Sequence, residues 1–173
     1  MMTSRFAKCA VAVGAIGLAA VLPSNAQAAG TTATATAVVA TAIGIAKTVD
    51  MSFGTIGATG TAGTVVLGTD GSRTCTDVDC LSGSPGAAAS FDVTGQGTNT
   101  YSITLPADGV VTLTGLGPAM ACDSFLSLPL TTGTLSGGAQ TLLVGCTLFV
   151  GTAAVQTPDT YTSAAFTVTV NYN

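Results

Sequence analysis

The sequence lacks three residue types on which many functional sites depend. Its 173 residues include no His, no Glu and no Trp, and only 4 are Lys or Arg. Without His, the chain cannot form a Ser-His-Asp or Cys-His catalytic site, nor a His-ligated metal site. With so few basic residues, it cannot neutralise the phosphates that drive nucleic-acid binding. The composition therefore argues against an enzyme and against a nucleic-acid partner.

Charged residues of either sign are scarce, whereas apolar residues are abundant. Charged residues make up 7% of the chain and hydrophobic residues 47%. Disordered segments have the opposite composition, with low hydrophobicity and high net charge. We therefore expect a folded protein.

The first 28 residues have the order of parts found in a cleaved secretory signal. Arg5 and Lys8 supply a positive start, the uncharged run Cys9–Leu22 follows, and residues 26–28 form an Ala-x-Ala cleavage site. The uncharged run is shorter than the roughly 20 apolar residues that span a bilayer. We predict cleavage after Ala28 and export to the periplasm, the cell surface or the medium, with no membrane span in the remaining chain.

The remaining chain, residues 29–173, is long enough for a single domain with one core. Its only bases are Lys47 and Arg73, and its eight acids are all Asp, so its net charge is −6. Such a surface should repel nucleic acid and anionic membranes. We therefore predict one acidic domain.

Four cysteines remain after the predicted cleavage, namely Cys75, Cys80, Cys122 and Cys146. An even number in an exported chain suggests two disulfides, for which three connectivities exist. A zinc site would need a second close-spaced pair beside Cys75 and Cys80, and there is none. We expect Cys75 to pair with Cys80. Cys122 and Cys146 share the parity of the apolar residues around them, so we expect them to pair inside the core, the alternative being two buried thiols.

Thr, Val and Ile recur at every second position, and Gly, Pro, Asn and Asp interrupt the runs, as in short antiparallel strands. No comparable window has the 3.6-residue apolar period of a helix. The sequence predicts an all-β fold, an immunoglobulin-like antiparallel β-sandwich with Greek-key connections and about 7–8 strands. The predicted strands cover residues 34–49, 63–67, 90–94, 101–105, 110–114, 120–128, 141–150 and 160–173.

The segment Gly68–Ala89 is the least regular part of the chain. Asp77 and Asp79 flank Val78 there, and calcium binds six to eight oxygen ligands in flexible geometry. These two residues are weak calcium candidates, because a solvated acidic loop is a far commoner explanation for them. We expect no cofactor and no other metal site. The serine in Asp123-Ser124 has no His to activate it, so we expect no catalytic residue.

Several sequence blocks occur in an order that resembles a known family. The blocks are MSFGTI (51–56), GTVVL (63–67), DGSR (70–73), AASFDVTG (88–95), YSITLP (101–106), VTLTG (111–115) and YTSAAFTVTVNYN (161–173). They resemble a bacterial exported family called domain of unknown function forty-four-zero-two. The resemblance implies an immunoglobulin-like sandwich and no established activity. More distantly, the chain is similar to spore-coat-U-type and archaic chaperone–usher pilin subunits.

The pilin resemblance implies assembly by β-strand addition, in which an extended segment of one subunit fills an open groove in another. Thr34–Ile45, within the predicted strand 34–49, would be the donor, and Tyr161–Asn173 would line the acceptor groove. A periplasmic chaperone and an outer-membrane usher would be the partners. Both segments are equally compatible with ordinary strands of a closed sandwich. The residues implied in strand exchange are Val39, Ile43, Ile45, Phe166, Val168, Val170 and Tyr172.

Two hypotheses for the function follow. The first is a non-enzymatic, self-assembling structural subunit of a pilus-like surface fibre or coat. The second is a monomeric secreted module that binds a glycan or calcium through the loop Gly68–Ala89.

Overall fold

A computed structural model of the protein describes residues 28–173. The predicted signal, residues 1–28, lies outside the described residues except for Ala28. Val38–Asn173 forms one compact unit, which we call the β-domain, and the described residues before Val38 lie outside it. The described residues before Val38 contain neither helix nor strand, and they are exposed. No helix in the described range is long and apolar enough to cross a membrane.

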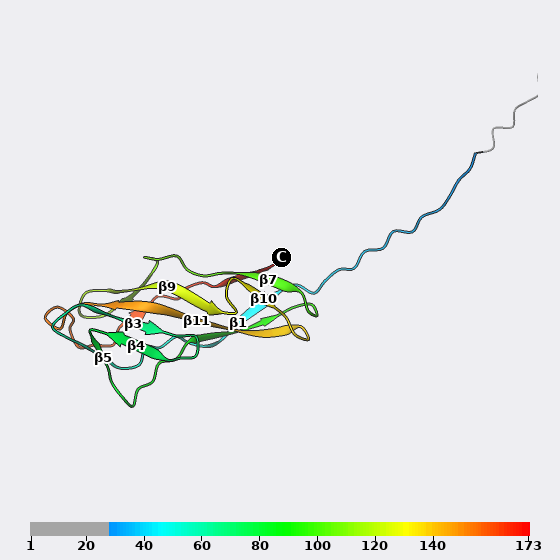
Figure 1. Cartoon of the computed structure of the whole chain (residues 1–173). Coiled ribbons are helices and arrows are strands. Elements are labelled where there is room, and N and C mark those ends of the chain that lie inside the picture. The colour runs from blue at the N-terminus through cyan, green and yellow to red at the C-terminus, as the bar shows by residue number, and fades with distance from the viewer. Residues whose placement is uncertain (1–27) are drawn as a thin grey trace, which may run out of the picture. The chain divides into compact units, whose positions relative to one another are not determined.

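The described part of the β-domain contains strands, turns and loops but no helix (Figure 1). This arrangement confirms the predicted all-β sandwich. The strands are β1 (Gly44–Val49), β2 (Ile56–Ala58), β3 (Gly63–Leu67), β4 (Arg73–Thr76), β5 (Val78–Cys80), β6 (Ala89–Thr94), β7 (Thr100–Thr104), β8 (Val111–Thr114), β9 (Met120–Leu128), β10 (Thr132–Thr134), β11 (Ala139–Val150), β12 (Thr162–Ser163) and β13 (Thr169–Tyr172).

One curled sheet carries most of the strands. Its path runs β1-β6-β11-β9-β8-β12, while β3 and β4 extend it beside the second half of β11. The long strand β11 pairs with β6 through residues 139–144 and with β3 through residues 147–150. Gly145 lies at this change of partner, where a Cβ would overlap with the carbonyl oxygen of Leu67. The remaining strands form a three-stranded sheet, β10-β7-β13, and a pair, β2-β5.

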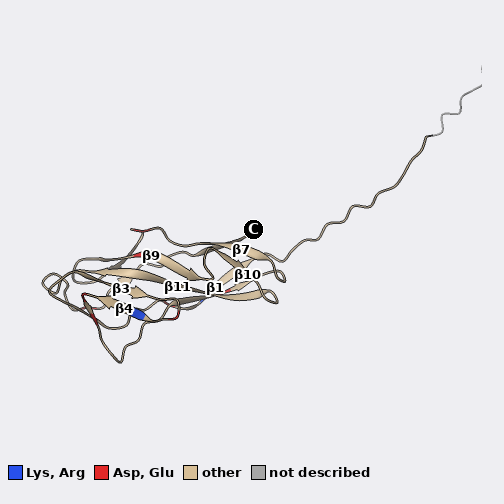
Figure 2. Cartoon of the chain, in the orientation of Figure 1, with Lys and Arg blue, Asp and Glu red and all other residues tan. Residues whose placement is uncertain are grey.

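Period-two alternation directs one face of the strands into the core. In β6, Ala89, Phe91 and Val93 are buried, whereas Asp92 and Thr94 face solvent. The buried residues form two hydrophobic clusters, and a few half-buried residues pack against both of them, namely Met51, Phe125 and Phe166. Figure 2 shows how sparsely charged residues are distributed over the β-domain.

Both predicted disulfides are present. Cys75 pairs with Cys80, and Cys122 with Cys146, each with a Cα–Cα distance of 6.0 Å. Cys122 and Cys146 are only 1% and 0% exposed, as their parity with the apolar residues of β9 and β11 predicted. The second disulfide thus joins two adjacent strands of the curled sheet inside the core.

The two longest predicted strands were wrong in extent. Residues 34–43 are not a strand, and only Gly44–Val49 pairs, with β6. Alternation alone does not make a strand, because the backbone also needs a neighbouring strand to pair with. The predicted strand 160–173 is broken into β12 and β13, since the chain passes there from the curled sheet to the three-stranded sheet.

The other predicted strands match the structure closely. The bounds of β3 and β9 are as predicted, and those of β6, β7, β8 and β11 differ by one or two residues. Four short strands, β2, β4, β5 and β10, were not predicted. They lie in Gly-rich or Asp-rich segments that carry no run of alternating residues, so the sequence held no period-two signal for them.

We expect the stability of the fold to be constant between about pH 5.5 and 8.5, since no side chain after Ala28 has an ordinary pKa in that range once the cysteines are paired. Hydrogen bonds from the Ser72 side chain and backbone lower the pKa of Asp70. Its stabilising contribution is therefore complete above its unfolded-state pKa and is lost as the pH falls through the lowered folded-state pKa.

Burial raises the pKa of Tyr101, whose hydroxyl donates to Gln140 Oε1 at 2.8 Å. The contribution of Tyr101 is complete below its unfolded-state pKa of about 10 and is lost as the pH rises through the raised folded-state value. Thermal unfolding, monitored by circular dichroism at a series of pH values, checks the loss of stability at low pH and the loss at high pH. Tyr101→Phe should weaken the loss of stability at high pH without affecting the loss at low pH. A change in melting temperature centred near pH 6.5 would contradict the prediction.

Candidate functional site

A groove of about 840 Å³ opens between the two edge strands of the curled sheet, β1 and β12. We call it the seam groove. One wall contains β1 and the loop after it, residues 47–56, and we call it the β1 wall. The opposite wall is formed by residues 159–166. The floor consists of side chains from the inner face of the sheet, namely Ala89, Phe91, Val111, Leu113, Met120, Cys122 and Leu148.

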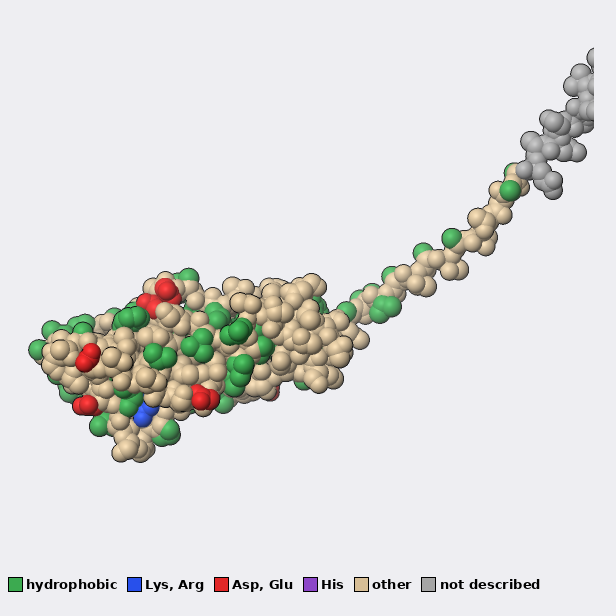
Figure 3. Space-filling view, viewed as in Figure 1, with side chains coloured by type: hydrophobic (Ala, Val, Ile, Leu, Met, Phe, Trp, Pro, Cys, Tyr) green, Lys and Arg blue, Asp and Glu red, His purple; other side chains and the backbone are tan. Residues whose placement is uncertain are grey.

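The floor of the seam groove belongs to the hydrophobic core. Val111, Met120 and Leu148 are at most 5% exposed and belong to one of the two core clusters. Phe166 extends the apolar surface from the second wall, and its ring lies 5.7 Å from that of Phe125, centroid to centroid. The face seen in Figure 3 likewise carries clusters of hydrophobic side chains and few charged ones.

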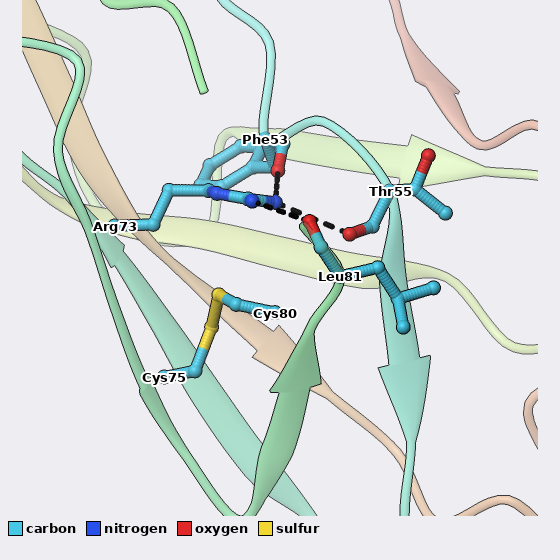
Figure 4. Close-up of a disulfide and its surroundings, with 6 residues drawn as sticks. All are labelled: Phe53, Thr55, Arg73, Cys75, Cys80 and Leu81. Atoms are coloured by element: carbon cyan, nitrogen blue, oxygen red, sulfur yellow. Dashed lines mark hydrogen bonds between the residues drawn. A yellow bond between two sulfur atoms is a disulfide. The ribbon is translucent and has the colours of Figure 1, made fainter. Parts of the chain in front are cut away.

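Arg73 fixes the shape of the β1 wall (Figure 4). Its Nη1 donates to the carbonyl oxygens of Phe53 and Thr55 at 2.8 and 3.1 Å, and its Nη2 donates to that of Leu81 at 3.0 Å. The only ion pair among the described residues joins Lys47 to Asp50, so Arg73 acts as a donor to backbone and not as a partner of a carboxylate. The planar guanidinium suits this task because its N–H groups form a rigid fork.

Gly54 lies between the two Arg73-bound carbonyls of the β1 wall. Its φ of 63° is in the left-handed region, and a Cβ there would overlap with the carbonyl oxygen of Ser84. The Cys75–Cys80 disulfide holds β4 and β5 together beside this loop. The blocks MSFGTI and DGSR, far apart in the sequence, therefore meet in one structural unit that builds the β1 wall.

The second wall is anchored at its start by the loop between β8 and β9. Asp159 Oδ2 accepts a hydrogen bond from the Leu116 amide at 2.8 Å. The Tyr161 hydroxyl accepts one from the Gly117 amide at 2.9 Å and donates to the Thr157 carbonyl at 2.8 Å. Beyond β12, however, the backbone of Ala164–Val168 forms no hydrogen bond with any described residue. We call Ala164–Val168 the free edge.

The free edge has an unpaired backbone although two of its side chains anchor it. Val168 is buried and Phe166 is half-buried, whereas Ala164, Ala165 and Thr167 are exposed. More than 90% of buried backbone groups in proteins have a hydrogen-bond partner, and an exposed row of unpaired groups is a template for another strand. The free edge therefore has the backbone groups that an additional strand requires.

The structure divides the residues implied in strand exchange among three places. Phe166 lines the seam groove, while Val168 and Val170 are buried in the core. Ile43 and Ile45 pack against the same core cluster as Val168, so they are engaged within their own chain. Val39 is 94% exposed.

Tyr172 holds the start of the β-domain. Its hydroxyl donates to the Thr41 carbonyl at 2.9 Å and accepts a hydrogen bond from the Gln96 amide at 2.6 Å. Gln96 Oε1 in turn accepts from the Thr41 hydroxyl at 3.0 Å. These contacts fix Thr41 to the β-domain. We call residues 29–40, which precede this point, the arm.

The weak calcium candidates lie apart from the seam groove. Asp77 follows β4 with a φ of 54°, and Asp79 lies in β5 opposite Gly57. Within residues 28–173, no three His, Cys, Asp or Glu side chains are grouped closely enough to hold a metal ion. The lining of the seam groove combines apolar side chains and hydroxyls with the charged residues Lys47, Asp50 and Asp159.

Sequence reasoning missed three features of the site. The carbonyl-binding role of Arg73 leaves no pattern in the sequence, because backbone oxygens are present at every residue. The β1 wall and the floor come from segments that only the sheet topology brings together. The sequence did not reveal the unpaired backbone of the free edge, because apolar residues alternate there as they do in the strands on either side.

A family model described as a domain of unknown function (DUF4402) matches residues 43–172. The chain belongs to this family, and the match begins just after the arm. No curated protein and no solved structure matches the chain.

Replacing Arg73 with Met should destabilise the β-domain by about 2–3 kcal/mol, because three backbone carbonyls lose a charged donor. Urea unfolding of the purified protein measures this difference. Lys47→Met is the matched control, since it removes the same charge from an exposed ion pair worth less than about 1 kcal/mol. Arg73→Lys should behave like Arg73→Met, because an ammonium group lacks the fork. Equal stability of the Arg73→Met and Lys47→Met variants would contradict the role assigned to Arg73.

Proposed function

We propose, for this member of a family whose function is unknown, that the protein is a non-enzymatic structural subunit that assembles by β-strand addition into a surface fibre or coat. The free edge is the observation that carries the proposal. It combines an unpaired backbone with an adjacent groove whose floor is hydrophobic core. In β-strand addition, main-chain hydrogen bonds supply affinity and pockets for alternate side chains supply specificity.

The arm has the composition of a donor for this groove. It contains no charged residue and no Pro. In an extended conformation, Ala33, Ala35, Ala37 and Val39 lie on one face, while Thr32, Thr34 and Thr36 lie on the other. The apolar face would contact the floor and the threonines would face solvent. Because Ile43 and Ile45 pack in their own core, the donor part of the predicted segment Thr34–Ile45 ends before Thr41.

Export fits the same proposal. The two disulfides are typical of proteins outside the reducing cytosol, and the first 28 residues have the order of parts of a secretory signal. A subunit with an open hydrophobic groove needs protection before assembly, so we include a periplasmic chaperone and an outer-membrane usher as partners.

A single charge on the apolar face of the arm should prevent assembly. Ala37→Asp would bring an unpaired carboxylate to a hydrophobic floor, which costs several kcal/mol. Thr36→Asp, the matched control, adds the same charge one residue away on the solvent face. Both residues precede the β-domain, so neither change should alter its melting temperature.

Unheated SDS gels of material shed from the cell surface test this prediction. The unchanged protein and Thr36→Asp should give ladders that collapse to monomer on boiling, and Ala37→Asp should give monomer alone. Monomer in every unheated lane would contradict the proposed function. Equal ladders for both variants would contradict the assigned faces of the arm.

A further inference from the structure

We infer that the Cys75–Cys80 disulfide is a thiol–disulfide exchange site, at which a dithiol reductant releases β5 from β4 while the rest of the fold stays intact. The partner would be a dithiol oxidoreductase of the Cys-x-x-Cys class. The inference is independent of the proposed function. It follows from the accessibility of the two disulfides and from the few other bonds that connect β4 with β5.

The two disulfides differ in accessibility. Cys122 and Cys146 are 1% and 0% exposed, so a reductant reaches them only when the core opens. Cys75 and Cys80 are half-buried, and each has an exposed residue before it and after it in the chain. Exchange requires that a thiolate reach one of the two sulfur atoms. The Cys75–Cys80 disulfide should therefore react first.

The Cys75–Cys80 disulfide connects two sheets that share few other bonds at this place. β4 pairs with β3 of the curled sheet, whereas β5 pairs with β2 in the separate two-stranded pair. No backbone hydrogen bond joins β4 to β5 within the described chain. Besides the disulfide, Arg73 of β4 donates to the carbonyl oxygen of Leu81, the residue after β5. By contrast, β9 and β11, which the core disulfide joins, also share an antiparallel ladder.

Cleavage of the Cys75–Cys80 bond should act locally. Its sequence separation is 5 residues, against 24 for the core disulfide. In the chain-entropy description, the disulfide that closes the shorter loop stabilises the fold less. Val78, in the middle of β5, is 7% exposed and belongs to a core cluster, so it keeps β5 attached to the β-domain. The reduced protein should therefore stay folded, with a looser β2-β5 pair and a looser β1 wall.

The exchange transfers two electrons from the reductant to the disulfide. A thiolate of the reductant attacks the Sγ atom of one cysteine, the S–S bond breaks, and the other cysteine leaves as a thiolate. The second thiol of the reductant loses its proton to water and displaces the first cysteine from the mixed disulfide. The reductant departs as a disulfide, and the two cysteines take up two protons.

Arg73 favours this exchange. It lies two residues before Cys75, so both side chains are on the same face of β4, and Figure 4 shows it beside the disulfide. A nearby positive charge stabilises the thiolate that leaves. The acidic residue Asp79, next to Cys80, lies on the opposite face of β5.

Limited reduction of the purified full-length protein tests the inference. The folded protein is treated with dithiothreitol for a series of times, free thiols are blocked with a maleimide, and the labelled cysteines are identified by peptide mass. Cys75 and Cys80 should be labelled at least about tenfold faster than Cys122 and Cys146. Hydrogen exchange of the same samples should increase in residues 52–58 and 78–81 but not in β9 and β11. Oxidised glutathione should reverse both changes.

A double variant, Cys75→Ser with Cys80→Ser, reproduces the reduced state without a reductant. Its hydrogen exchange should match that of the reduced parent protein and should not respond to dithiothreitol. A Cys-x-x-Cys oxidoreductase whose second cysteine is replaced by serine should form a mixed disulfide with the parent protein but not with the double variant.

Equal labelling rates for the two disulfides would overturn the inference. Labelling of Cys75 and Cys80 without faster hydrogen exchange in residues 52–58 would overturn the release of β5, and the absence of a trapped mixed disulfide would overturn the assigned partner. The time course of the parent protein decides the first two points even if the double variant does not fold. None of these measurements depends on surface assembly, so their failure would leave the proposed function untouched.

Discussion

The site depends on one constraint, which is that a backbone held in place by its side chains still needs hydrogen-bond partners. Ala164–Val168 has to cross from the edge of the curled sheet to the edge of the three-stranded sheet. Phe166 and Val168 pack this crossing against the core, whereas Ala164, Ala165 and Thr167 are exposed. Among the described residues, no strand pairs with its backbone. The seam groove lies beside this crossing, and its floor is formed by side chains of the hydrophobic core.

Because the chain has few charged residues, the walls of the groove are held mainly by hydrogen bonds to backbone groups. With only Lys47 and Arg73 as bases after residue 28, the walls cannot be held by networks of ion pairs. The chain instead places Arg73 against three backbone carbonyls and places Asp159 and Tyr161 against backbone amides. Each of these contacts orders a loop through backbone groups. Among the charged residues of the lining, Lys47 and Asp50 pair with each other, and Asp159 accepts a hydrogen bond from the Leu116 amide.

The sequence predicted the fold better than the site, for a physical reason. Period-two alternation reports which face of a strand is buried, so it predicted the main strands correctly. The parity of Cys122 and Cys146 within that alternation predicted the core disulfide. Alternation does not report whether a neighbouring strand is present. For this reason the predicted strands were too long at residues 34–43 and 164–168, where side chains alternate but the backbone is unpaired. These two segments include the donor and the acceptor of the proposed assembly, so both errors concern segments on which the proposed function depends.

In the proposed assembly, an arm of small residues would bind mainly through its backbone. Ala35, Ala37 and Val39 bury little apolar area, whereas five residues paired along the free edge form several main-chain hydrogen bonds, each worth about 1 kcal/mol net. Main-chain bonding distinguishes poorly between side chains but strictly between directions, because parallel and antiparallel ladders place their donors and acceptors differently. In the proposed assembly, the direction of the arm would therefore contribute more to selection than its small side chains do.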